Sequence, residues 1–161
     1  MRLPHLENEK GFTLIELLMV IAIFGILMVA IQGLFRAGVD IFSWENDSAN
    51  RRQQLYIASE HITRAIRNTA PDQIELQDGY LDFYREIVLT SPTGDEIRFY
   101  LKKGIIYRWE DGQSRSIATK IAALRFSRED NDNGVFYQVY LKSDKKKGKD
   151  LEIKTGVRPR L

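Results

Sequence analysis

One carboxylate, Glu16, stands near the start of an otherwise apolar stretch that runs from Gly11 to Phe35. No polar side chain follows between Leu17 and Ile31. An ionised carboxylate inside hydrocarbon costs about 2.5–3.5 kcal/mol on insertion scales, and acids inside a membrane are functional candidates by default. Glu16 is therefore the first candidate for chemistry, as a charge that needs a counter-charge. The alternative is that it lies at the membrane interface and stays hydrated.

The element that must position Glu16 is a long apolar helix. Residues 12–35, as a helix with a rise of about 1.5 Å per residue, are long enough to cross a bilayer core of about 30 Å. The core helix of a soluble protein would show a polar face at a spacing of 3.6 residues, and this stretch shows none. The pattern predicts a transmembrane helix.

The residues before this helix form a motif with it. A short polar segment, Met1–Lys10, precedes Gly11, and Phe12-Thr13-Leu14-Ile15-Glu16 opens the apolar run. This arrangement closely resembles the processing and methylation signature of type IV prepilins and type II secretion pseudopilins. The resemblance implies that a prepilin peptidase cleaves between Gly11 and Phe12 and methylates the new amine of Phe12. It also implies that Glu16 meets the N-terminal amine of a neighbouring subunit during assembly.

The same resemblance implies a location. Arg2 and Lys10 lie before the apolar run, which fits a leader that stays in the cytoplasm. We expect a single-pass protein of the cytoplasmic (inner) membrane, with its C-terminal domain outside, that later enters a pilus or pseudopilus. A secretory signal peptide would need a shorter apolar region with the cleavage site after it, and here the candidate site comes first.

The rest of the chain predicts an α+β fold, with the long N-terminal helix packed on an antiparallel β-sheet domain. We expect a leader at 1–11, a transmembrane helix at 12–35, an amphipathic helical continuation at 36–70 and the sheet domain at 71–161. Residues 43–54 are polar, which leaves a helix break open. The apolar stripe of the continuation consists of Leu55, Ala58, Ile62, Ala65 and Ile66, with Arg51, Arg52, Arg64 and Arg67 expected outside. From Ile74 onward the period becomes strand-like, and the strands given with bounds are 87–90, 96–101, 105–109, 121–127, 135–141 and 151–155.

This layout also resembles the J-type minor pseudopilins and the related minor pilins of type IV pili and competence systems. The likeness rests on the order of elements, a hairpin that ends in Tyr107-Arg108, a strand with Leu124-Arg125-Phe126, and a terminal strand that ends in Thr155-Gly156-Val157-Arg158-Pro159-Arg160. It implies a subunit near a filament tip that helps to initiate or cap assembly. Its partners would be other major and minor pilins or pseudopilins.

Composition argues against catalysis. The chain has no cysteine and only two histidines, His5 and His61, which lie far apart. It also lacks the glycine loops of Walker or Rossmann type that bind phosphates. The chain lacks the cysteine or paired histidines from which a nucleophile–base pair is commonly built, so we expect that it is not an enzyme. The net charge of +2 is too small to indicate nucleic-acid binding by itself.

Two loops carry weaker signals. Asp130, Asp132 and Asn133 place oxygen ligands before a glycine, as calcium loops do, although Asn-Gly is also a plain turn signal. Calcium is the one cofactor that this leaves open. A basic loop could contact DNA or anionic lipid, but a solvated loop tip is the simpler interpretation. Its cations are Lys145, Lys146, Lys147 and Lys149.

The sequence therefore leaves three hypotheses for the function. The first is a minor pilin or pseudopilin subunit that serves a type II secretion pseudopilus or a type IV pilus. The second is a DNA- or ligand-binding minor pilin of a competence or uptake pilus. The third is a membrane-anchored module with no filament role, in which Glu16 is incidental.

Overall fold

The structure is a computed structural model that describes residues 12–80, 83–91, 93–131, 134–144 and 150–160. The backbone divides into two compact units, residues 1–44 and 45–161. Helix α1 runs without a break from Leu14 to Arg67. The polar residues 43–54, where the sequence leaves a break open, are helical.

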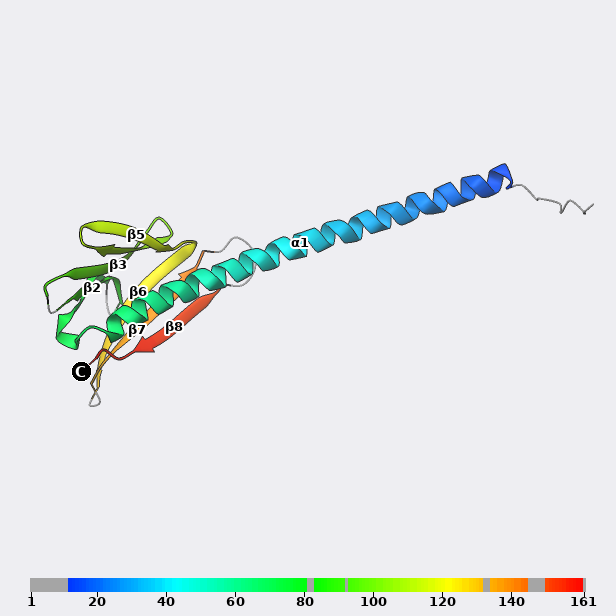
Figure 1. Ribbon diagram of the computed structural model, residues 1–161. Helices are drawn as coiled ribbons and strands as arrows, with labels where there is room; N and C mark the ends of the chain where they lie inside the picture. The colour runs from blue at the N-terminus through cyan, green and yellow to red at the C-terminus, as the bar shows by residue number, and fades with distance from the viewer. Residues whose placement is uncertain (1–11, 81–82, 92, 132–133, 145–149, 161) are drawn as a thin grey trace, which may run out of the picture. The chain divides into compact units, whose positions relative to one another are not determined.

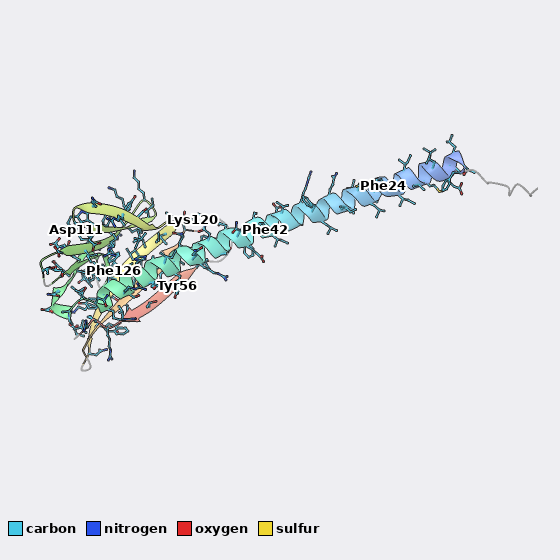
Figure 2. All side chains as sticks on the ribbon, in the orientation of Figure 1. Phe24, Phe42, Tyr56, Asp111, Lys120 and Phe126 are labelled. Atoms are coloured by element: carbon cyan, nitrogen blue, oxygen red, sulfur yellow. The ribbon has the colours of Figure 1, made fainter. Side chains whose placement is uncertain are left out.

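The first unit consists, in its described part, of the apolar portion of α1. Its large apolar side chains are exposed on every side of the helix, from Leu14, 77% exposed, to Phe42, 72% exposed. Phe24 and Phe42 project from the ribbon in Figure 2. By length and composition, α1 is the one helix in the described part of the chain that could cross a membrane.

The second unit holds an antiparallel sheet covered on one face by the C-terminal part of α1 (Figure 1). Helix α1 ends ahead of Pro71, because a residue before proline is pushed out of helical geometry. A short 3-10 helix, η1 (Pro71–Gln73), follows it. The strands are β1 (Ile74–Tyr80), β2 (Phe83–Thr90), β3 (Glu96–Lys102), β4 (Ile105–Glu110), β5 (Gln113–Ala118), β6 (Ile121–Asn131), β7 (Gly134–Ser143) and β8 (Glu152–Val157). The predicted α+β class is confirmed.

Strand β2 joins two parts of the sheet. The order is β5-β4-β3-β2-β6-β7-β8, and β1 pairs with the other side of β2. Residues 86–90 of β2 pair with β3, whereas Tyr84 pairs with Phe126 of β6. The eight strands thus form one sheet, in which each neighbouring pair is antiparallel.

Two tight turns shape the β3–β4–β5 meander. Lys103 and Gly104 between β3 and β4 both have positive φ, as do Asp111 and Gly112 between β4 and β5. Positive φ at both central residues is what a type I′ hairpin turn requires, and its twist matches that of the flanking strands. The first turn is predicted from the sequence. Strand β5 is missing from the predicted strands, because the residues that begin it are all polar.

The hydrophobic core lies between α1 and the sheet. Leu55, Ala58, Ile62 and Ile66 are at most 1% exposed, and Ala65 is partly buried against them, so the predicted stripe is confirmed. They belong to one cluster with core residues from the strands. The largest fully buried side chains on the sheet side are Phe99, Phe126, Tyr137, Ile87, Leu89, Ile106, Ile121, Leu141 and Val139.

Truncating this stripe tests its contribution to stability. Ile62→Ala removes a fully buried side chain, and such changes cost about 2–5 kcal/mol, because they lose burial and leave a cavity. We expect a drop of that size in the free energy of unfolding, measured by denaturant titration of the full chain in detergent micelles with near-UV circular dichroism. Tyr56→Ala is the control, since Tyr56 is 65% exposed, and its effect should stay within about 0.5 kcal/mol. Equal effects of the two changes would contradict this packing.

Candidate functional site

The N-terminus of α1 is closed by a reciprocal pair of side chains. The backbone N–H of Thr13 donates to Oε2 of Glu16 at 2.9 Å, and the backbone N–H of Glu16 faces Oγ1 of Thr13 at 3.4 Å. The hydroxyl of Thr13 also donates to Oε2 of Glu16 at 2.7 Å. This is a capping box, in which the residue before the helix and the third helical residue satisfy each other's backbone donors.

The capping box engages one of the two carboxylate oxygens of Glu16. Both hydrogen bonds that the carboxylate accepts end on Oε2, and within the described part of the chain none ends on Oε1. A carboxylate has about four lone-pair positions for acceptance. Glu16 can therefore stabilise its own helix and still offer Oε1 to a cation from outside the chain.

The sequence motif is placed only in part. Phe12 directly precedes α1 and is exposed, and Glu16 lies in the first turn. Gly11 and the rest of the leader lie outside the described residues, so the proposed cleavage site has no geometry here. Sequence reasoning missed Thr13, although a threonine followed three residues later by glutamate is the signature of a capping box.

Replacing the cap tests the geometry of the helix start. Thr13→Val keeps the shape of the side chain but removes the hydroxyl that Glu16 uses, and loss of such a cap costs about 0.5–2 kcal/mol of local helix stability. We expect faster hydrogen exchange at the amides of Glu16 and Leu17, which both bond to Thr13, measured by NMR on the full chain in micelles. Thr13→Ser retains the hydroxyl and should exchange as the wild type does. Unchanged exchange in Thr13→Val would show that the cap contributes nothing.

A second polar cluster lies where α1 meets the sheet of the second unit. Arg51 is buried, with 3% of its surface exposed, so the expectation that it lies outside is wrong. The helical period explains this, because Arg51 precedes Leu55 and Ala58 by four and seven residues and shares their face. An arginine is usually solvated, but the position of Arg51 on the apolar face of the helix buries its side chain.

Arg51 has several partners, although its buried Nε makes an ion-pair contact rather than a well-formed hydrogen bond. Its Nε lies 3.3 Å from Oδ2 of Asp47, and one terminal nitrogen donates to the carbonyl of Asp144 at 3.2 Å. Asp47 in turn lies 2.7 Å from Nζ of Lys120, which sits beside α1 in Figure 2. The backbone N–H of Thr119 donates to Gln54 at 2.8 Å. This helix-anchoring cluster, Asp47, Arg51, Gln54, Thr119, Lys120 and Asp144, ties α1 to the β5–β6 turn and the end of β7.

Removing the buried arginine tests this anchoring. Arg51→Ala removes a donor from the carbonyl of Asp144 and a cation from beside Asp47, so we expect a loss of about 2 kcal/mol in the free energy of unfolding. The matched control is Arg52→Ala, because Arg52 is the exposed neighbour on the same helix. Denaturant titration of the full chain in micelles compares the two. A cost at position 52 as large as at position 51 would contradict the anchoring role.

The other arginines of α1 lie at its surface. Arg52, Arg64 and Arg67 are exposed, as expected, and Arg64 pairs with Glu60 one turn earlier. Exposed pairs at this spacing contribute only a few tenths of a kcal/mol. Whether these arginines contact another subunit stays a prediction.

The calcium candidate is described only at its first residue. Asp130 lies in β6, where it accepts a hydrogen bond from Nε of Arg128 at 2.9 Å. That bond raises the pKa of Arg128, and partial burial of the guanidinium lowers it by less. Asp132 and Asn133 lie outside the described residues. Within the described ranges no three acidic or histidine side chains cluster as metal ligands, and calcium binding stays a prediction.

The lysine loop is likewise not described. Lys145, Lys146, Lys147 and Lys149 lie outside the described residues, and only the flanks of the loop are placed. Nζ of Lys142 lies 3.1 Å from Oδ2 of Asp150 and 3.3 Å from Oε1 of Glu152. Hydrogen bonds to Asp150 and then Glu152 raise the pKa of Lys142, which keeps it cationic. Nucleic-acid or lipid contact by the loop stays a prediction.

Comparison with known proteins bears on the N-terminus. Residues 7–31 match the family model described as the prokaryotic N-terminal methylation motif. The predicted pilin-like N-terminus is therefore confirmed, and with it the membrane-anchoring character of the apolar helix. Neither the search of curated proteins nor the search of solved structures finds a match to this chain.

Proposed function

We propose that this chain, whose residues 7–31 carry the prokaryotic N-terminal methylation motif, is a minor pilin or pseudopilin subunit. A prepilin peptidase would cleave between Gly11 and Phe12 and methylate Phe12. The mature subunit would then leave the membrane and enter a type IV pilus or type II secretion pseudopilus through α1. Its role is structural, because the chemistry is performed on the chain by its processing enzyme.

The observation that carries this proposal is the state of Glu16. Its carboxylate lies in the first turn of an apolar helix, with Oε2 engaged by Thr13 and Oε1 facing no donor in the described part. Two opposite charges attract strongly in a medium of low dielectric constant, and a lone charge there is costly. The amine of Phe12 in a neighbouring mature subunit is a cation of the required sign. Pairing with it would set the axial register between subunits.

The exposure of the apolar helix supports the same role. Large side chains on all sides of α1 from Leu14 to Phe42 are exposed, so this segment needs an apolar environment from outside the chain. A bilayer supplies one before assembly, and the helices of other pilins supply one within a filament. A plain membrane anchor would need only the first of these environments.

The division of the chain follows from this function. We propose a leader at 1–11, a membrane and filament-core helix at 12–35, a helical continuation at 36–70 and a sheet domain at 71–161 outside the cytoplasmic membrane. Like the J-type minor pseudopilins that the layout resembles, the subunit would help to initiate or cap the filament. The absence of cysteine and the antiparallel sheet after a long helix are compatible with that role.

Two measurements test this function. Mass spectrometry of the protein from its native host should find an N-terminus at Phe12 with one added methyl group. Glu16→Ala should still insert into the membrane but enter sheared filament fractions far less than the wild type, because the charge pair is lost. Glu45→Ala, an exposed acid farther along the same helix, is the matched control and should assemble normally. An intact leader, or normal incorporation of Glu16→Ala, would refute the proposal.

A further inference from the structure

A cleft of about 600 Å³ opens in the second unit at the C-terminal end of α1. Its walls come from that helix end, from η1, from β2, β3 and β4, and from the segment after β8. Pockets of 300–1,000 Å³ are the usual size for bound ligands. This cleft is separate from the N-terminal motif and from the helix-anchoring cluster.

The charged side chains among the described lining of the cleft are arginines. Arg64 comes from α1, Arg108 from β4 and Arg160 from the chain beyond β8, and His61 adds an imidazole. Asp and Glu are absent from the described lining. Segments far apart in the sequence thus bring three guanidinium groups to one hollow, and guanidinium is the side chain best suited to bind carboxylate or phosphate.

Arg108 occupies a position where the fold alone favours an apolar residue. It lies directly opposite the fully buried Phe99 in the β3–β4 ladder, and Ile106, two residues earlier on the same face, is also fully buried. A polar group at such a position costs free energy unless it is paired. A terminal nitrogen of Arg108 donates to Glu110 at 2.8 Å, but its buried Nε has no acceptor among the described residues. The described contacts therefore satisfy Arg108 only in part, although its side chain lines the cleft.

Two of the three arginines at the cleft already have an acid partner, and Arg160 has none among the described residues. Glu60 pairs with Arg64 and Glu110 with Arg108, but neither acid lines the cleft, and no described carboxylate pairs with Arg160. The carbonyls at the end of α1 carry partial negative charge. Three of them already accept hydrogen bonds from Asn68 or Thr69, which lessens their opposition to an anion.

We propose that this cleft binds an acidic peptide segment of a partner protein, whose carboxylates pair with Arg108, Arg160 and Arg64. The apolar part of the wall, which includes the half-buried Ala65 and Ile97, would receive apolar side chains of the same segment. A single inorganic anion would leave most of the volume and this apolar wall unused. The combination of size, cations and apolar wall therefore favours a peptide over a small ion.

Fluorescence polarisation on the full chain in detergent micelles tests this site. The probe is a fluorescein-labelled peptide of alternating glutamate and leucine, and the control peptide has glutamine in place of each glutamate. We expect the acidic peptide to bind and the glutamine peptide to bind at least tenfold more weakly. Arg108→Gln and Arg160→Gln should each weaken binding of the acidic peptide about tenfold, since each removes a charged hydrogen-bond donor.

The controls separate this site from general charge and from unfolding. Arg115→Gln removes an exposed arginine of β5 outside the cleft and should leave the affinity unchanged. Arg160 is exposed, so its variant should keep the wild-type thermal midpoint and test the site even if Arg108→Gln is unstable. Equal binding of both peptides, unchanged affinity in Arg160→Gln, or displacement by an equal concentration of inorganic phosphate would overturn the proposal. None of these outcomes depends on cleavage at Gly11 or on assembly through Glu16.

Discussion

The structure depends on an apolar helical surface that the chain itself does not cover. From Leu14 to Phe42 the large side chains of α1 are exposed on every side, and each would gain about 1.5–3 kcal/mol on full burial. Water cannot be the working environment of such a segment. A bilayer is one environment that can satisfy it, and the helices of other subunits are a second in the function proposed above.

Helix α1 changes character along its length without a break. Its first part is apolar all round, whereas from Leu55 to Ile66 only one face is apolar, and that face is buried against the sheet. The helix-anchoring cluster lies at the start of this second part, with Arg51 buried on the same face. One continuous helix thus has an exposed apolar part and a part packed on the sheet. Its side-chain pattern changes between the two parts, while its backbone hydrogen bonding continues.

Periodic features could be predicted from the sequence, and features assembled from distant segments could not. The α+β class, the stripe on α1 and most strands follow from hydrophobic period. Arg51 was misplaced because its residue type outweighed its period, and β5 was missed because Gln113 to Ser116 are polar despite the Asp111-Gly112 turn signal before them. The cationic cleft had no sequence signal, since its arginines lie in three separate elements and only the folded sheet brings them together. The capping box did have a signal, in the spacing of Thr13 and Glu16.

The two type I′ turns have a consequence for the order in which the second unit folds. They close β3–β4 and β4–β5 over two residues each, and hairpins of this kind form in about 1–10 μs. The contact between Gln54 and Thr119 closes a separation of 65 residues, and that between Ser59 and Thr155 one of 96. Because closing such long loops costs more chain entropy, we expect the meander to form first and α1 to dock last. Until it docks, the apolar stripe of α1 stays open to chaperones or to a wrong partner.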